Sequence, residues 1–426
     1  NVLILGSGGR EHAFALKVRE SKLCSNVYVA PGNSGTALIA NNLNIGVNEF
    51  SKIELAIEEY NISVLIVGPE APLVNGIRDR IRSNDTNNNL IIVGPGKVGA
   101  MLEGSKDFTK SFLFRHNIPT ANYSTFTKQN IEEGFKHIDK MPSPYVLKAD
   151  GLAAGKGVLI IKNKKEAKQQ LKEILINSKF GKAGNKVVIE EFLDGIEISC
   201  FVLTDGNQYK ILPSAKDYKR IGENDTGLNT GGMGAVSPPP FLNKKLKSKI
   251  ELNIIKPTIQ GLKKDNIPFV GFIFFGLIIV KEDPKVIEYN VRMGDPETEV
   301  VFPRIKSDFL ELIMALDSGN LNSFDLQIDN EPAVTIVLVS GGYPEKYEIN
   351  KQIFGLENIS KTDSYVFHAG AKIENEVLKT SGGRVLAITS KAKSIDLALK
   401  KSYHSIKQIK FNKIYFRKDI GFDLKK

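Results

Sequence analysis

Short apolar runs alternate with amphipathic stretches through the first hundred residues. The apolar runs cover residues 2–5, 27–30, 64–67 and 90–93, and glycine follows each of them, directly or after a proline. Between them the spacing predicts amphipathic helices at about residues 10–20, 51–60 and 75–83. Strands that alternate with helices, with glycine loops at the strand carboxyl ends, predict a doubly wound parallel sheet that binds ligands at that edge.

The middle of the chain has a different pattern. A helix is expected at residues 105–116. The apolar periodicity then predicts strands at residues 145–148, 158–161, 187–192, 272–280 and 285–289. Helices are predicted at residues 164–176, 244–264 and 308–316. Residues 215–240 are polar and glycine-rich, and they predict a long loop that is either functional or disordered.

The last hundred residues predict a small α+β unit. A strand at residues 333–340 ends in Gly-Gly-Tyr-Pro, and further strands precede a helix at residues 395–406. A chain of 426 residues has room for two to four domains, and its 42% hydrophobic content excludes wholesale disorder. The fold class expected is therefore mixed α/β and α+β with several domains.

Composition narrows the possible partners and compartment. The longest apolar run, residues 270–280, is too short to span a bilayer, and no signal peptide is visible, so we expect a cytoplasmic protein without a membrane partner. Cys24 and Cys200 are far apart and lie in apolar surroundings, which favours reduced core thiols. The net charge of +10 comes mostly from scattered lysines. Because no basic block interleaves with aromatic residues, we expect no nucleic-acid partner.

Candidate chemistry begins at Lys148, the last residue of a predicted strand. The loop that follows holds Gly151, Gly155, Lys156 and Gly157. Glycines let a backbone approach phosphate oxygens and direct its N–H groups toward them. The spacing is not a Walker A motif, because no Gly-Lys-Ser/Thr opens a helix. An ordinary flexible hairpin is the alternative, but the adjacent lysine favours a mobile lid over a nucleotide phosphate.

A second candidate lies at the strand end formed by Glu190, Glu191, Phe192 and Leu193. An apolar platform beside backbone groups suits an adenine ring, and a carboxylate suits ribose hydroxyls. Glu197 is a further candidate for the ribose contact. A solvated strand end is the alternative interpretation.

The third candidate is a strand followed by a Gly-Asp-Pro turn. Glu288 and Asn290 are two residues apart, so their side chains face the same side of the strand. A carboxylate and an amide oxygen in that arrangement make a magnesium site. Arg292 continues on the same face, where it could stabilise developing negative charge, and Asp295 follows in the turn.

Two glycine-rich segments leave alternatives open. Residues 217–220 and 227–234 could bind a small zwitterion and a phosphate, or could form a mobile connector. Residues 6–12, Gly-Ser-Gly-Gly-Arg-Glu-His, resemble a dinucleotide fingerprint but lack its third glycine at the proper spacing. Anion binding at the N-terminus of the following helix is the other option.

Residues 148–157, 190–193 and 288–297 together resemble the ATP-grasp superfamily. Residues 8–12, 31–36, 68–73, 104–106, 229–234 and 382–386 extend the likeness, over essentially the whole chain, to the glycinamide ribonucleotide synthetase family. The resemblance implies a Rossmann-like N-terminal domain (1–103), an ATP-grasp domain (104–328) with a lid lobe at about 122–193, and an α+β C-terminal domain (329–426). We expect a monomer.

The activity implied by this resemblance joins glycine to 5-phosphoribosylamine. ATP is cleaved to ADP and phosphate, glycyl phosphate is the intermediate, and the reaction is the second step of purine synthesis. Magnesium, or manganese in its place, is the implied metal.

The resemblance also implies roles for individual residues. ATP would contact Lys106, Lys148, Gly155, Lys156, Gly157, Glu190, Glu191, Phe192, Leu193 and Glu197. The metal ligands would be Glu288 and Asn290, and the catalytic residues Lys148, Arg292 and Asp295. The other substrates would contact Gly8, Gly9, Asp217, Asn229, Thr230, Gly231, Gly232, Met233, Arg292, Gly294 and Asp295. Tyr218 and Leu228 stand where the family often has His and Pro, which affects only the fine geometry of the substrate loop.

Two other interpretations are considered. Another ATP-grasp carboxylate–amine ligase or a carboxylase component is possible, although biotin dependence would need a carrier partner and residues 227–234 argue against it. A nucleotide- or RNA-binding protein without chemistry is the other, but such a protein has no need of a magnesium site beside Arg292.

Overall fold

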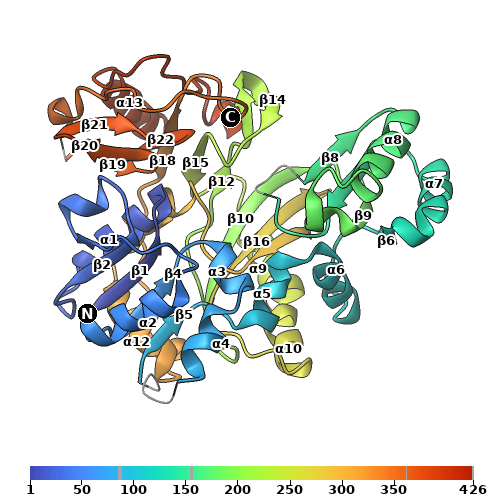
Figure 1. Ribbon diagram of the computed structural model, residues 1–426, viewed down its shortest axis with the longest axis horizontal. Helices are drawn as coiled ribbons and strands as arrows, with labels where there is room; N and C mark the ends of the chain where they lie inside the picture. The colour runs from blue at the N-terminus through green and yellow to red at the C-terminus, as the bar shows by residue number, and fades with distance from the viewer. Residues whose placement is uncertain (85–88, 154–156, 361, 425–426) are drawn as a thin grey trace.

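The computed structural model describes residues 1–84, 89–153, 157–360 and 362–424. Figure 1 shows the N-terminal part beside a central sheet, with a small lobe projecting on the right and the C-terminal part at the top. None of the helices among these residues is long and apolar enough to cross a membrane. The apolar run that stood out in the sequence is a buried strand, as predicted.

The N-terminal part is a five-stranded parallel sheet in the order β3-β2-β1-β4-β5. Its strands are β1 (Val2–Gly6), β2 (Val27–Pro31), β3 (Asn41–Asn42), β4 (Val64–Val67) and β5 (Ile91–Val93). Its helices are α1 (Gly9–Arg19), α2 (Phe50–Glu59), α3 (Glu70–Val74), α4 (Ile77–Arg82) and α5 (Lys97–Gly104). The doubly wound prediction is confirmed. The chain reverses direction across the sheet between β1 and β4, which places the loop after β1 at a ligand-binding edge.

The central part is built on a four-stranded antiparallel sheet in the order β11-β10-β16-β17. Its strands are β10 (Ile196–Thr204), β11 (Tyr209–Ile211), β16 (Gly271–Val280) and β17 (Asp283–Asn290). Its helices are α6 (Lys106–Arg115), α9 (Lys244–Ile250), α10 (Lys256–Lys264), α11 (Thr298–Val301) and α12 (Phe309–Asp317). A π-helical turn at Glu251–Ile255 joins α9 to α10, so the predicted single helix is one continuous run.

The N-terminal and central sheets share one hydrophobic core. Leu3 and Leu65 of the parallel sheet pack in the same cluster as Phe275 and Tyr289 of the antiparallel sheet. The loops after β1 and β17 are therefore held by a rigid unit.

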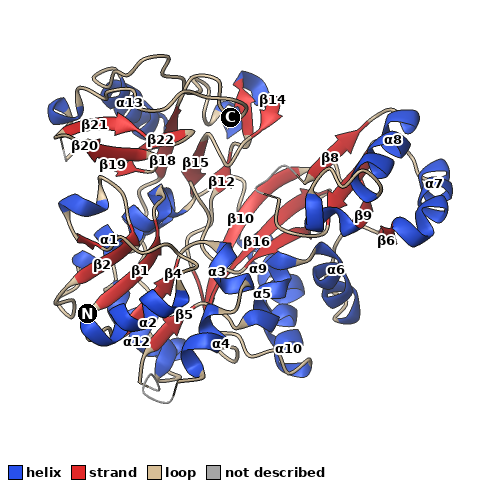
Figure 2. Cartoon of the chain, in the orientation of Figure 1, coloured by secondary structure: helices blue, strands red, loops and turns tan. Residues whose placement is uncertain are grey.

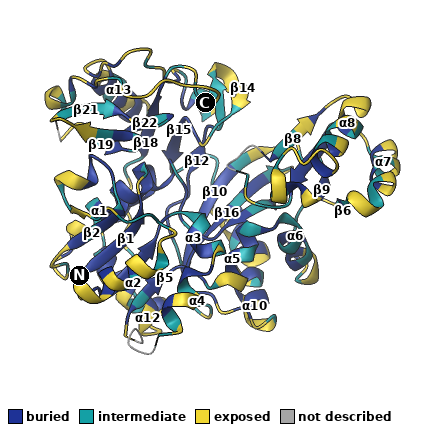
Figure 3. Ribbon diagram, in the orientation of Figure 1, coloured by how far each residue is buried: buried dark blue, intermediate teal, exposed yellow. Residues whose placement is uncertain are grey.

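The lobe has a separate core. Its sheet runs in the order β6-β9-β7-β8. The elements are β6 (Tyr123–Thr127), α7 (Ile131–Lys140), β7 (Tyr145–Ala149), β8 (Val158–Ile161), α8 (Lys164–Leu175) and β9 (Lys186–Glu191). Phe126, Leu147 and Leu171 belong to a hydrophobic cluster confined to these elements. Figure 3 shows exposed residues on α7 and α8 at the outer side of the lobe and buried residues along β9. The antiparallel pairing of β7 with β8 matches the predicted hairpin. Gly155 and Lys156, in the loop between them, lie outside the described residues.

The C-terminal part contains β18 (Ala333–Val339), β19 (Tyr365–His368), β20 (Ala371–Glu374), β21 (Val377–Thr380), β22 (Arg384–Lys391) and α13 (Ile395–Ile406). Its main sheet runs in the order β12-β15-β18-β22-β19. Two of its strands, β12 (Lys216–Asp217) and β15 (Gly234–Ser237), come from the segment predicted to be a long loop, and Figure 2 shows them joining the upper sheet. That prediction was wrong because β15 is short and only weakly apolar, and its pairing with the distant β18 forms the strand.

A cluster of aromatic rings ties α1 to the central part. Phe14 is buried, and its ring centroid lies 4.7 Å from that of Phe302, edge to face, and 5.9 Å from that of Phe309. We expect Phe14→Ala to lower the free energy of unfolding by about 3–5 kcal/mol because it leaves a cavity among rings that cannot close it. Phe14→Leu should cost clearly less. Urea unfolding of the purified variants measures both, and a loss below about 1 kcal/mol for Phe14→Ala would contradict this packing.

Candidate active site

Lys148 lies where the lobe meets the central sheet. It is buried on β7, and its Nζ is 2.9 Å from Glu190 Oε1 on the neighbouring strand β9. The same Nζ donates a hydrogen bond of 3.2 Å to the backbone oxygen of Ile287 on β17. One lysine of the lobe therefore reaches the strand that carries Glu288 and Asn290.

Glu190 is held by a second lysine that the sequence did not single out. Lys110 of α6 is buried, and its Nζ lies 3.0 Å from Glu190 Oε2 and 2.8 Å from Thr120 Oγ1. Burial lowers the pKa of Lys110 to about 8 although Glu190 opposes the shift. Both carboxylate oxygens of Glu190, expected from the sequence to face adenosine, are thus paired with lysines. In sequence, Lys110 looks like any other lysine of a polar helix.

The residues after β9 offer an apolar surface. Phe192 is 40% exposed, which is unusual for a phenylalanine and suits a ring that stacks on a ligand. Glu191 accepts hydrogen bonds of 3.0 and 3.2 Å from the backbone and side chain of Asn122, which fixes the start of this segment. Leu193 is half-buried beside it. Lys106, at the start of α6, donates to the backbone oxygen of Gly151 at 3.1 Å.

Glu288 and Asn290 both lie on β17, as predicted. The carboxylate of Glu288 makes no hydrogen bond or ion pair with any described residue, and it packs over Gly276 on β16, where a Cβ would lie 3.0 Å from Glu288 Cγ. Asn290 is buried, and its Oδ1 accepts a hydrogen bond of 3.0 Å from Arg292 Nη2. A free carboxylate and an amide oxygen are hard donors that leave room for waters and phosphates, so this pair fits magnesium. No cluster of three or more His, Cys, Asp or Glu residues suited to a metal occurs in the described part of the chain.

Arg292 is fixed by acidic residues from the N-terminal part. Its Nη2 lies 2.7 Å from Glu103 Oε1 at the end of α5, and its Nε lies 3.4 Å from Glu70 Oε2 at the start of α3. Burial raises the pKa of Glu103, although Arg292 opposes the shift. The guanidinium plane is therefore oriented beside Asn290 before any ligand binds. Glu70 lies within the motif at residues 68–73, but the sequence assigned no role in orienting Arg292 to either acidic residue, because both are far from Arg292 along the chain.

Asp295 is held at the junction of all three parts. Arg384 Nη1 lies 3.1 Å from Asp295 Oδ1 and 2.7 Å from the backbone oxygens of Asp295 and of Gly231. Burial would raise the pKa of Asp295, but Arg384 and Arg10 outweigh it and hold the carboxyl below its ordinary range. Asp295 therefore stays ionised in the Gly-Asp-Pro turn.

The glycine pair before α1 packs against two carboxylates. A Cβ on Gly8 would lie 2.9 Å from Asp295 Oδ2, and one on Gly9 would clash with the carboxylate of Glu299. Glu299 is fully buried on α11, and neither of its oxygens has a hydrogen-bond partner among the described residues. Burial and the nearby Asp295 raise the pKa of Glu299 well above its ordinary value. Only glycines fit at this close approach.

A second acidic group surrounds Lys219, which follows β12. Its Nζ contacts Glu197 of β10 directly and lies 3.5 Å from Asp217 Oδ2. Burial lowers the pKa of Lys219, but Asp217, Glu197 and Glu288 outweigh it and raise the pKa well above its ordinary value. Burial and Asp217 raise the pKa of Glu297 to about 7. Glu197, expected to face ribose, is thus engaged by Lys219.

The remaining predicted residues have positions fixed by backbone pairing or close packing. Asn229 ends β14 (Thr226–Asn229), which pairs with β13 (Arg220–Gly222). The hydroxyl of Thr230 donates to Lys219 O at 2.8 Å and accepts from the N–H of Gly232, and Met233 is fully buried. Gly294 precedes the turn, where a Cβ would clash with Glu297. Gly157 accepts a backbone hydrogen bond of 2.8 Å from Ala149.

The two cysteines lie outside this arrangement. Cys200 is buried on β10, and burial raises the pKa of its thiol to about 11. Cys24 is half-buried in the loop before β2, and burial raises the pKa of its thiol as well. Because the thiolate is the reactive form, neither cysteine is suited to act as a nucleophile.

The fold and this site define the class of ATP-grasp enzymes: a lobe carrying a lysine faces a central antiparallel sheet carrying a carboxylate–amide pair. Models of the phosphoribosylglycinamide synthetase family match the chain in three parts. The N domain matches residues 1–103, the ATP-grasp (A) domain residues 104–298 and the C domain residues 333–423. The chain belongs to the phosphoribosylglycinamide synthetase family.

Several relatives cover the whole chain. It is 44% identical over 420 residues to phosphoribosylamine–glycine ligase of Clostridium acetobutylicum, with 99% of both chains covered. It is 44% identical over 427 residues to the bifunctional purine biosynthetic protein PUR2,5 of Pichia angusta, of which it spans 53%. The crystal structure of phosphoribosylamine–glycine ligase from Thermotoga maritima is similar at TM-score 0.85 and 33% identity, covering 98% of this chain and 99% of that one.

A more distant likeness concerns the fold alone. The biotin carboxylase domain of 2-oxoglutarate carboxylase from Hydrogenobacter thermophilus superposes with TM-score 0.71 at 15% identity, covering 97% of this chain and 91% of that one.

Proposed function

We propose that this chain joins glycine to 5-phosphoribosylamine, with ATP cleaved to ADP and phosphate, as the second step of purine synthesis. The observation that carries the proposal is the bond from Lys148 to the backbone of Ile287, next to Glu288. It brings the lysine of the lobe, the carboxylate–amide pair of β17 and Arg292 to one place. Transfer of a phosphoryl group depends mainly on such positioning and on charge neutralisation.

The reaction proceeds in two displacements. A carboxylate oxygen of glycine attacks the γ-phosphorus of ATP, the bond to the bridging oxygen of ADP breaks, and glycyl phosphate forms. The amine nitrogen of the ribosylamine then attacks the glycyl carbonyl carbon. The carbon–oxygen bond to phosphate breaks, and the nitrogen loses a proton to a base, a role that we assign to the ionised Asp295. No covalent bond to the enzyme is needed.

Each group of residues has its part in these displacements. Lys106 and Lys148 neutralise phosphate charge, and Phe192 with its neighbours holds the adenine. Magnesium, or manganese in its place, would be held by Glu288 and Asn290 and would neutralise the charge on phosphate oxygens. Arg292 stabilises the acyl phosphate, since its orientation is fixed by Glu103 and Glu70.

The lobe closes over the nucleotide in this proposal. Residues at about 122–193 have their own hydrophobic core, separate from the rest of the domain at 104–328. A body of this kind can rotate while its packing stays intact. We also propose that the protein is a monomer, and the two unpaired cysteines suit the reducing cytoplasm.

The test is ADP release measured with glycine and freshly made phosphoribosylamine, each omitted in turn. The proposal requires ADP to form in the complete mixture and to fall to background when glycine is left out. ADP formed with bicarbonate and a biotin carrier instead would identify a carboxylase component. No ADP with any acceptor would indicate a binding protein.

A further inference from the structure

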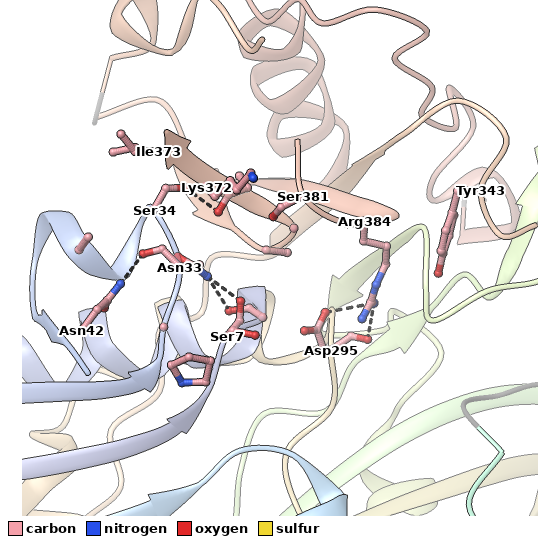
Figure 4. Close-up of a pocket in the computed structure, with 18 residues that line it drawn as sticks. Ser7, Asn33, Ser34, Asn42, Asp295, Tyr343, Lys372, Ile373, Ser381 and Arg384 are labelled. Carbon is pink, nitrogen blue, oxygen red and sulfur yellow. Dashed lines mark hydrogen bonds and ion pairs between the residues drawn. The ribbon is translucent and has the colours of Figure 1, made fainter. Parts of the chain in front are cut away.

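A pocket of about 730 Å³ opens between the N-terminal and C-terminal parts, with Asp295 on its wall. Figure 4 shows Ser7 and Asn33 contributing from the N-terminal side, and Lys372, Ser381 and Arg384 from the C-terminal side. A volume of this size suits a small molecule. The residues proposed to bind ATP do not line it, which leaves the pocket to a different substrate, and Asp295, proposed above as catalytic, is on its wall.

The charges in the pocket are unevenly placed. Among its described lining residues, the charged side chains are Asp295, Arg384 and Lys372. Arg384 already binds the turn that holds Asp295, because its Nη1 contacts Asp295 and the backbone of Gly231. In Figure 4 this pair lies to one side of the pocket and Lys372 to the other. One end of the pocket is therefore built around a carboxylate, and the other has a lysine.

Lys372 is available to a ligand. Its ion-pair partner among the described residues is Glu374, at 3.1 Å, and the two side chains are 41% and 45% exposed. Exposed ion pairs contribute at most about 1 kcal/mol. Glu374 also lies 2.8 Å from Lys379, so it keeps a cationic partner when Lys372 turns toward the pocket.

The surface beside Lys372 has hydrogen-bond donors and few bulky side chains. Ser381 directly follows β21, which pairs with the strand of Lys372, and its hydroxyl makes no hydrogen bond with a described residue. Gly370 and Gly382 approach so closely that a Cβ on Gly370 would lie 2.6 Å from Gly382 Cα. The wall here is backbone, which lets an anion come near peptide N–H groups.

We propose that Lys372, together with the hydroxyl of Ser381, binds the 5-phosphate of the ribosylamine, while the amine end lies at Asp295. The inference rests on the proposed function and deepens it by assigning the phosphate end of the acceptor. A molecule with a phosphate dianion at one end and an amine at the other matches the lysine and the carboxylate of the pocket. A lysine–phosphate contact is a charge-assisted hydrogen bond, among the stronger polar contacts that proteins make.

The kinetic test uses Lys372→Met with Lys379→Met as its matched control. Both lysines pair with Glu374 on one hairpin, but Lys379 does not line the pocket. Lys372→Met should raise the KM for phosphoribosylamine about 30-fold, equivalent to about 2 kcal/mol. The KM values for ATP and glycine should stay unchanged, and Lys372→Arg should recover most of the loss. Lys379→Met should behave as the wild type. An unchanged KM for phosphoribosylamine in Lys372→Met would overturn the assignment.

A binding test separates this inference from the proposed function. Ribose 5-phosphate and ribose are titrated into the full chain without ATP or glycine, and heat release is measured. The wild type and Lys379→Met should bind ribose 5-phosphate and not ribose, and Lys372→Met should bind ribose 5-phosphate about 30-fold more weakly. Equal affinity of Lys372→Met and wild type for ribose 5-phosphate would refute the subsite while the ligase activity stood. Absence of ligase activity with this binding pattern intact would refute only the proposed function.

Discussion

Glu288→Gln is expected to reduce turnover at least about 100-fold while the fold stays intact. Gln has nearly the same shape, and the carboxylate of Glu288 bonds to no described residue, so the change breaks no contact there. It removes the negative charge that the metal site requires, a loss of about 3 kcal/mol or more in transition-state stabilisation. The measurements are kcat at saturating magnesium, the affinity for Mn²⁺, and the melting temperature.

Glu282→Gln is the matched control for this variant. Glu282 lies in the turn between β16 and β17 and forms an exposed pair with Lys245, so the same chemical change should leave kcat and Mn²⁺ affinity unchanged. Near-normal turnover of Glu288→Gln at saturating magnesium would contradict the assignment of β17 as the metal strand.

Arg292→Lys is expected to have the second largest effect, a fall in kcat of about 100-fold. Arg292 contacts acceptors on three elements, at Glu103, Glu70 and Asn290. An ammonium group cannot satisfy this planar set, so the charge would move away from the position where the acyl phosphate forms. Steady-state kinetics should show the loss in kcat with little change in the KM for ATP.

Arg80→Lys is the matched control for Arg292→Lys, because it makes the same charge-conserving replacement. Arg80 makes an exposed, two-pronged contact with Glu54 at 3.0 and 3.1 Å, so it undergoes the same loss of geometry away from the site. It should retain full activity. Arg292→Lys with activity within about threefold of the wild type would show that the site needs only a positive charge there, contrary to this account.

The local spacing of apolar residues was enough to predict the strands and helices whose own sequences show that spacing. The placement of Glu288 and Asn290 on one strand could be predicted from the sequence because side-chain direction in a strand follows directly from spacing. Arg292, expected to continue the same face, lies beyond the end of β17 at Asn290. The parallel sheet followed in the same way from apolar runs and glycine loops. By contrast, β15 forms only through its partner β18, and Gly-Ala-Val-Ser has no strand signal of its own.

Contacts between segments far apart in the sequence form the parts of the site that the sequence did not predict. Lys110 looked like a surface lysine, yet burial against Glu190 changes its role. Glu103 and Glu70 orient Arg292 from helices that lie far from it in the sequence, and Arg384 fixes Asp295 from the C-terminal part. Such pairings depend on how the domains pack together, which no spacing along one chain segment encodes.

In the proposed mechanism, glycine is activated as an acyl phosphate at this site. The measurement uses glycine labelled with ¹⁸O in both carboxylate oxygens, together with ATP and phosphoribosylamine, and mass analysis of the products. If glycine attacks the γ-phosphorus first, one labelled oxygen leaves with the phosphate when the amine displaces it. The account predicts phosphate carrying one ¹⁸O and an amide that keeps the other. Unlabelled phosphate would contradict it.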